Sequence, residues 1–217
     1  MNPAWLKPPL FLLCLAPLGY YVWGLQADTL GANPVEAVTR GLGTWALNLL
    51  LVTLSVTPLR KLLGWQWLLR LRRMLGLFVF FYASLHLATY LWLDQSLDWP
   101  AIARDILKRP FITVGMICFA LLVPLAATSN ALALRHLGGR RWQELHRTVY
   151  AIAILAVLHY AWMVKADIRT PLLYALAVAI LLGARAAWRL QERRRQLAGA
   201  YAHKPPARRI MPIAVRK

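Results

Sequence analysis

The sequence predicts an all-α integral membrane protein, a bundle of six transmembrane helices with both termini in the cytoplasm. Hydrophobic residues make up 59% of the 217, above the share that is usual in soluble domains. The long apolar runs contain very few charges, and the formal net charge of +18 gathers in the segments between and after them. This placement argues against a nucleic-acid-binding surface and indicates a chain that lies in a bilayer.

Six apolar runs approach or exceed the length that crosses the hydrocarbon core, which is about 20 residues for a helix. In order they are residues 8–26, 41–59, 74–93, 111–128, 148–166 and 171–188. The first run follows Lys7, has no clear small-residue cleavage site and precedes five more runs, so we expect a retained anchor. The connections are short and show no convincing internal repeat, which favours one compact bundle.

The distribution of basic residues predicts the orientation. If the N-terminus is cytoplasmic, most of the 26 Lys and Arg residues fall on the cytoplasmic side, at Lys7, in residues 60–73 and 135–147, and from Arg185 onward. The opposite side mixes fewer basic residues with most of the acidic ones, so the positive-inside rule places both termini in the cytoplasm. We expect one transmembrane domain over residues 1–190 and a basic, disordered cytoplasmic tail over residues 191–217.

Two histidines lie near the middle of apolar runs. His86 follows Arg73 by 13 residues and His159 follows Arg147 by 12, so both imidazoles lie roughly 18 to 20 Å from the basic ends of their helices. One such histidine is often an interhelical hydrogen-bonding residue. Two at equal depth on parallel helices favour axial ligation of a haem. We expect the apolar walls of that site from Phe80, Phe81, Tyr82, Leu85, Tyr90, Leu155, Leu158 and Tyr160.

The other histidines and the cysteines give weaker signals. His146 lies at the basic mouth of the fifth run, roughly 20 Å from His159 along a helix, which suits a second cofactor. Counting along one helix puts these two on different faces, so an irregular turn or separate partners would be needed. We expect His136 and His203 to be solvated. Cys14 and Cys118 lie within spans and form no CxxC pattern, so we interpret them as packing residues.

Several strings around these histidines carry a resemblance. They are Arg72-Arg73-Met-Leu-Gly-Leu ahead of His86, Lys108-Arg109-Pro110, Pro124-Leu-Ala, and Trp142-x-x-Leu-His146-Arg147. Over about residues 8–190 the chain resembles the ferric reductase-like transmembrane family. More closely, it resembles the haem-binding subunits in that family that serve bacterial protein-methionine-sulfoxide reductases. The resemblance implies a six-helix cytochrome b of the bacterial inner membrane.

The resemblance also implies a function. Electrons come from the respiratory quinone pool or from a cytoplasmic flavin reductase, and they are delivered outward to a periplasmic molybdopterin-containing subunit. That partner, rather than this chain, reduces methionine sulfoxide in oxidised proteins, so we expect no catalytic residue here. Relatives are also associated with FMN. We expect the longest outward connection, from Asp94 to Arg109, to contact the partner.

The resemblance assigns roles to particular residues. His86 and His159 correspond to the paired ligands of an outer haem, and His146 to a ligand of an inner haem. The sequence departs from related ferric reductases and NADPH oxidases, which have a second histidine where this chain has Arg72 and Arg73. A guanidinium stays protonated and ligates iron poorly. We expect these arginines to bind haem propionates, FMN phosphate or lipid headgroups, or to act as positive-inside anchors.

Two alternatives remain open on the residues alone. A ferric or cupric reductase of the outer surface would use the same haem chemistry but would need an acceptor site, and the outer connections hold only scattered acids. A haem-free transporter could use His86 and His159 as a proton relay. The short chain shows neither a repeat nor a pair of interrupted helices of the kind that form transport sites.

Overall fold

The computed structural model describes residues 3–164 and 167–202, and these residues form helices and connecting turns without any strand. The main helices are α1 (Lys7–Gln26), α2 (Pro34–Leu63), α3 (Leu69–Thr89), α4 (Trp99–Lys108), α5 (Pro110–Ala127), α6 (Ala131–His146), α7 (Val149–Met163) and α8 (Arg169–Ala202). Two short 3-10 helices, Pro3–Leu6 and Gln66–Leu68, and a π-helical turn, Tyr90–Asp94, adjoin them. The chain is an all-α membrane bundle, as the sequence predicts.

Five helical stretches in the described residues are long and apolar enough to cross a membrane. They are Lys7–Gln26, Pro34–Leu63, Gln66–Asp94, Pro110–Ala127 and Arg169–Ala198, and each contains most or all of one predicted run. The predicted run 148–166 corresponds to α7, which has only 15 residues. Such a helix is about 22 Å long and falls short of a hydrocarbon core of about 30 Å. This run was therefore predicted too long, because hydropathy does not register the extended backbone of Val164 that ends the helix.

The chain divides into two units, residues 1–182 and 183–217, which we describe separately. The second unit contains the C-terminal part of α8, which stays helical through Ala202. The prediction of disorder from residue 191 is therefore wrong for residues 191–202. Glu, Gln, Arg and Leu dominate residues 190–197, and these side chains have high helix propensity. The rest of the predicted tail, with His203, lies outside the described residues.

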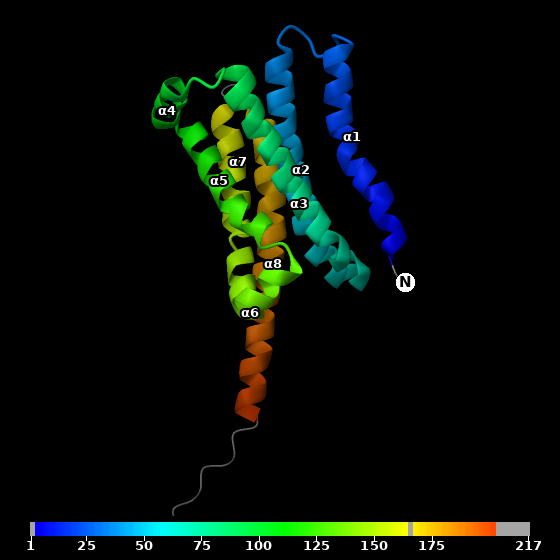
Figure 1. Ribbon diagram of the computed structural model, residues 1–217. Helices are drawn as coiled ribbons and strands as arrows, with labels where there is room; N and C mark the ends of the chain where they lie inside the picture. Colours follow the sequence, from blue (N-terminus) through cyan, green and yellow to red (C-terminus); the bar gives the residue numbers. More distant parts are fainter. Residues whose placement is uncertain (1–2, 165–166, 203–217) are drawn as a thin grey trace, which may run out of the picture. The chain divides into compact units, whose positions relative to one another are not determined.

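Local signals in the sequence define the ends of α2. The Asn33 side chain accepts a hydrogen bond from the Glu36 amide at 3.1 Å, and Pro34 occupies the first helical turn. Gly64 ends the helix with a φ of 72°, a left-handed conformation that favours glycine. Between these ends α2 packs along α3, α5 and α7 pack on each other, and the buried core of the first unit lies among these helices (Figure 1).

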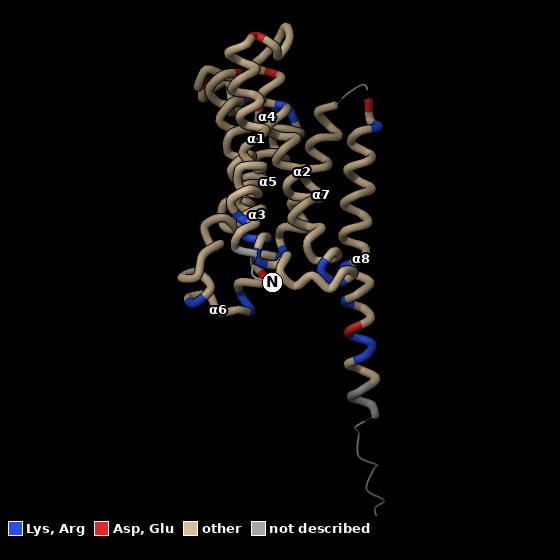
Figure 2. Tube along the Cα trace, turned by 90° about the vertical axis from the view of Figure 1, so that its right-hand side faces the viewer, with Lys and Arg blue, Asp and Glu red and all other residues tan. Residues whose placement is uncertain are grey.

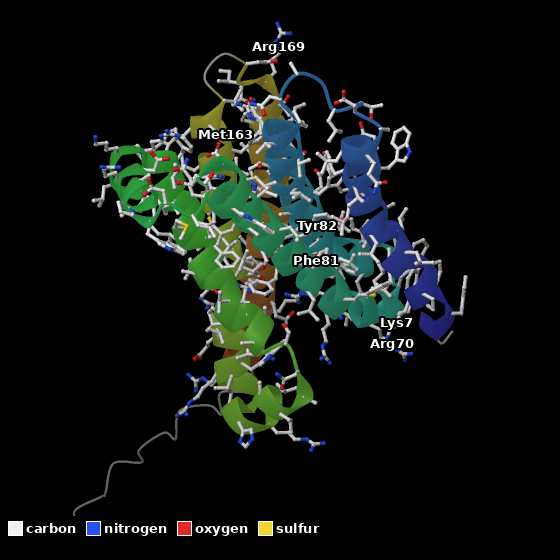
Figure 3. All side chains as sticks on the ribbon, turned by 45° about the horizontal axis from the view of Figure 1, so that its top comes forward. Lys7, Arg70, Phe81, Tyr82, Met163 and Arg169 are labelled. Atoms are coloured by element: carbon white, nitrogen blue, oxygen red, sulfur yellow. The ribbon has the colours of Figure 1, made fainter. Side chains whose placement is uncertain are left out.

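Charge differs between the two ends of the first unit. Figure 3 places Lys7 and Arg70 at one end and Met163 and Arg169 at the other. We call these the α6 end and the α4 end, after the short helix at each. Basic residues gather at the α6 end, whereas the α4 end carries both signs (Figure 2). This asymmetry agrees with the distribution from which the orientation was predicted.

The α4 end is a folded cap. The π-helical turn follows α3, and Ser96 and Leu97 then adopt φ values of 48° and 60° to reverse the chain. Asp98 caps α4 by accepting a hydrogen bond from the Ala101 amide at 3.0 Å. The Thr113 hydroxyl donates to the Ile106 carbonyl and joins α5 to α4. The connection that was predicted as a long outward loop is therefore a short helix held against the bundle.

Tyr82 on α3 joins α1 to the bundle. Its side chain is fully buried, and its hydroxyl donates to the Cys14 carbonyl at 2.7 Å and accepts from the Leu18 amide at 3.2 Å. In an undistorted helix these two backbone groups would bond to each other. Pro17 lies between them and lacks an amide hydrogen, and α1 bends midway along its length (Figure 1). Tyr82 therefore satisfies the backbone groups that the bend separates.

We predict that Tyr82→Phe destabilises the protein by about 1 to 3 kcal/mol, because the Cys14 carbonyl and the Leu18 amide lose their buried partner. Tyr20→Phe is the matched control, since Tyr20 lies on α1 and is exposed. Thermal unfolding in detergent, followed by circular dichroism, measures both variants. Equal transition temperatures for the two variants would show that the Tyr82 hydroxyl does not stabilise the bend.

Candidate functional site

His86 on α3 is held against α2. Its Nδ1 lies 2.7 Å from the Thr39 carbonyl. A carbonyl can only accept, so Nδ1 carries the hydrogen and donates it, and in the neutral ring Nε2 keeps a free lone pair. The ring packs on Gly43, where an added Cβ would lie 3.0 Å from Cε1 and Nδ1 of the imidazole. A side chain at position 43 would therefore displace the imidazole of His86.

His159 on α7 is held against α5 in the same way. Its Nδ1 lies 2.6 Å from the Phe111 carbonyl, so this nitrogen also donates and Nε2 again keeps its lone pair. A Cβ added at Gly115 would lie 2.9 Å from Cε1 and 3.0 Å from Nδ1 of the ring. In both histidines the contact of Nδ1 with a carbonyl thus leaves Nε2 of the neutral ring available to bind a metal.

The two supports share one local design, a carbonyl followed four residues later by a glycine. In a helix the carbonyl of residue i already accepts from the amide of residue i+4, and its second lone pair is free. Side chains tilt toward the helix N-terminus, so the side chain at i+4 lies over that carbonyl. Glycine at 43 and at 115 uncovers the Thr39 and Phe111 carbonyls for the imidazoles. We call these two arrangements the histidine cradles.

The cradles bring the two imidazoles together. Their ring centres lie 6.2 Å apart, and the ring planes differ by 75°. Both side chains line one cavity between α2, α3, α5 and α7. The cavity walls are mostly apolar, from residues that include Leu47, Ala83, Phe119, Ile152, Ala156 and Tyr160. Two neutral imidazoles with free Nε2 lone pairs thus face a common apolar space from different helices.

The predicted wall residues take different positions. Tyr90 and Tyr160 line the histidine cavity, and Phe80 lines a second cavity. Tyr82 contacts α1 instead. Phe81, Leu85, Leu155 and Leu158 line neither cavity. The wall residues were predicted from their closeness in sequence to His86 or His159, but neighbouring residues along a helix point to different faces.

His146 lies in the second cavity, toward the α6 end. Arg72 and Arg73 line the same space, which shares Leu50, Val79 and Leu122 with the histidine cavity. The prediction treated His146 and His159 as parts of one helix, but His146 ends α6 and a turn at residues 147–148 separates it from α7. The helical count that put them on different faces therefore does not apply.

The surroundings of His146 favour its neutral form. The Trp142 indole stacks on the ring with centres 3.8 Å apart, and Nδ1 lies 3.1 Å from the Trp142 carbonyl. Burial lowers the pKa of His146, the Trp142 and Leu125 carbonyls oppose this shift, and the positive charge of Arg72 lowers the pKa further. The buried Nε2 atom of His146 therefore lies without a hydrogen-bond partner among the described residues, in a cavity that Arg72 and Arg73 also line.

The other histidine and the cysteines that the sequence singled out take different positions. His136 is exposed on α6. Cys14 and Cys118 are both free thiols in the interior, and Cys118 lines the histidine cavity. The sequence analysis missed Thr39, Gly43, Phe111 and Gly115. The equal four-residue spacing of the two cradles was a possible signal, but it becomes recognisable only when the partner histidines are known.

Comparison with known proteins places these features in a family. Residues 42–157 match the family described as ferric reductase like transmembrane component, a stretch that includes His86, His146 and most of the helices around the cavities. A protein of Azospira oryzae named protein-methionine-sulfoxide reductase heme-binding subunit MsrQ is 58% identical over 98% of this chain and 89% of its own length.

Two further relatives with the same name are similar to this chain over most of their length. The protein of Herminiimonas arsenicoxydans is 50% identical over 87% of each chain. The protein of Rhodospirillum rubrum is 53% identical over 85% of this chain and 88% of its own. The chain therefore belongs to the ferric reductase-like transmembrane family and, within it, to the MsrQ group of protein-methionine-sulfoxide reductase heme-binding subunits.

Proposed function

We propose that this chain is a membrane cytochrome b that transfers electrons within a protein-methionine-sulfoxide reductase system. The observation that carries the proposal is the pair of cradled histidines, whose ring centres lie 6.2 Å apart in an apolar cavity. The names of the relatives, heme-binding subunits of this reductase, support both the cofactor and the system.

The residues present fit a haem. Two opposite imidazoles that each bind one iron at about 2 Å place their ring centres roughly 6 Å apart, in agreement with the 6.2 Å observed. The Nε2 lone pairs would be the ligating groups, and the contacts of Nδ1 with the two carbonyls orient the rings. When bound, haem b supplies reversible one-electron transfer. The chain's own residues orient it and exclude water from it.

We propose that His146 binds a second cofactor in the α6-end cavity. Its buried Nε2, which has no hydrogen-bond partner among the described residues, and its lowered pKa suit a ligand of an inner haem. Arg72 and Arg73 line the same cavity and can bind haem propionates, the phosphate of FMN or lipid headgroups. Between the two cavities, Phe80 and Phe119 stack with ring centres 5.6 Å apart. This apolar pair keeps the space between the two sites free of charge.

The direction of transfer follows from the orientation. With the basic α6 end at the cytoplasm of a bacterial inner membrane, the subunit accepts electrons there from the quinone pool or a cytoplasmic flavin reductase. The histidine cavity then lies toward the periplasm, near α4. We propose that the α4 end contacts a periplasmic molybdopterin-containing subunit, which performs the reduction of methionine sulfoxide, and that residues 1–190 are sufficient for electron transfer.

The family description favours a second candidate, a ferric reductase of the outer surface. It would use the same cavity and pass electrons to a chelated ferric ion at the α4 end. Rates of oxidation of the reduced protein distinguish the two functions. Faster transfer to the molybdopterin partner than to excess ferric chelate supports the reductase subunit, and the reverse order supports the surface reductase.

We predict that His86→Ala and His159→Ala each lose the haem of the histidine cavity while the bundle still inserts, because one remaining imidazole leaves the iron without its second ligand. His136→Ala is the control, since that histidine is exposed on α6. A pyridine haemochrome assay gives haem per chain, and size-exclusion chromatography checks the fold. Wild-type haem content in both cavity variants would refute the assignment.

We predict that Gly43→Ala and Gly115→Ala weaken haem retention by roughly five- to tenfold, because the new methyl group displaces the imidazole from its carbonyl and costs about one hydrogen bond. Alanine is also the better helix former, so thermal stability of the haem-free protein should not fall. Gly19→Ala is the control, since Gly19 lies exposed on α1, lines neither cavity, and an added Cβ there would meet no atom within 4 Å. The rate of haem transfer from each variant to apomyoglobin measures retention. Equal transfer rates for all three variants would contradict the role assigned to the histidine cradles.

A further inference from the structure

The histidine cavity has a charged end that the proposed function does not use. Arg40, Asp94 and Arg109 are its charged lining residues. Arg40 lies in the second turn of α2, Asp94 ends the π-helical turn after α3, and Arg109 directly precedes α5. All three therefore lie at the α4 end of the cavity, and these charged lining residues are two cations and one carboxylate.

Each arginine lies beside a histidine cradle. Arg40 directly follows Thr39, whose carbonyl holds His86, and Arg109 precedes Phe111, whose carbonyl holds His159, by two residues. The helices that fix the two imidazoles thus also fix the two guanidinium groups. Any ligand held by His86 and His159 lies within the space that both arginines line.

The ion pairs that Arg40 and Arg109 already form do not explain why these two residues line the cavity. Arg40 pairs with Glu36 and Arg109 pairs with Asp105, one helical turn away in each case. The arginine side chains remain 58% and 51% exposed. Asp105 is only 17% exposed, whereas the Arg40–Glu36 pair is exposed on both sides and of a kind that contributes little to stability, typically below about 1 kcal/mol. Both guanidinium groups keep donors for another anion, since each has five.

The opposite end of the cavity cannot take a charge. There Leu50, Val79 and Leu122 separate the histidine cavity from the second cavity. An occupant with an apolar body and an anionic edge must therefore turn that edge toward the α4 end, since an unpaired charge in an apolar interior is costly. Haem has this form, with two carboxylates on one edge of an apolar macrocycle.

We propose that Arg40 and Arg109 bind the two propionate carboxylates of the haem held by His86 and His159. This inference rests on the proposed function. Guanidinium groups form charge-assisted, bidentate hydrogen bonds with carboxylates, so the pair fixes how the macrocycle is rotated about the line between the histidines. The two cations also raise the midpoint potential, because the oxidised centre carries one more positive charge than the reduced centre and is disfavoured beside them.

The test uses the full-length protein in detergent and measures the haem midpoint potential by spectroscopic redox titration. We expect Arg40→Gln and Arg109→Gln each to lower the potential and the double variant to lower it further. Arg104→Gln is the matched control, since it removes the same charge from α4 at a residue that does not line the cavity. Glu36→Gln and Asp105→Asn control for the two ion pairs, and they should not reproduce the decrease.

A second measurement separates carboxylate binding from a general effect of charge. Haem-depleted wild-type protein and the double arginine variant are reconstituted with haem b or with its dimethyl ester, which has no ionised carboxylates. We expect the potential difference between the two proteins to be large with haem b and to shrink with the ester. An equal difference in midpoint potential with haem b and with its dimethyl ester would overturn the inference. An equal decrease of the midpoint potential in Arg104→Gln would also overturn it. Failure of the wild type to bind either compound would instead refute the proposed function.

Discussion

The hydrogen bonds from two imidazoles to the Thr39 and Phe111 carbonyls are the interactions on which the site depends. A histidine inside a membrane is costly unless its polar nitrogens are satisfied. Each carbonyl accepts a hydrogen bond from Nδ1, and the lone pair on Nε2 of the neutral ring remains available. The same hydrogen bond therefore offsets the cost of burying the imidazole and orients the ring so that Nε2 can bind a metal.

The arrangement of helices follows from this requirement. A carbonyl on α2 must meet a histidine on α3, and a carbonyl on α5 must meet a histidine on α7, so these pairs have to pack closely at one depth. Glycine at 43 and at 115 permits the close approach, and it does so at a cost in helix propensity of about 1 kcal/mol each. Tyr82 and the cap around α4 then hold α1 and the chain reversal against these two pairs.

Much of the fold and part of the site could be predicted from the sequence. Apolar runs and the distribution of basic residues are one-dimensional signals, and they located the spans and the two central histidines. The end of α7 at Met163 and the helical course of residues 191–202 were missed, because hydropathy does not report backbone conformation. The roles of Thr39, Gly43, Phe111 and Gly115 could not be assigned, since they depend on contacts between residues 47 or 48 positions apart in the sequence.

The central claim is that His86 and His159 ligate one iron from opposite sides. Low-temperature electron paramagnetic resonance of the oxidised wild-type protein tests it most directly. Two imidazole ligands make ferric haem low-spin, and planes that differ by 75° predict a low-spin signal of large g anisotropy. A ferric signal that is entirely high-spin, or folded protein without iron, would contradict the account.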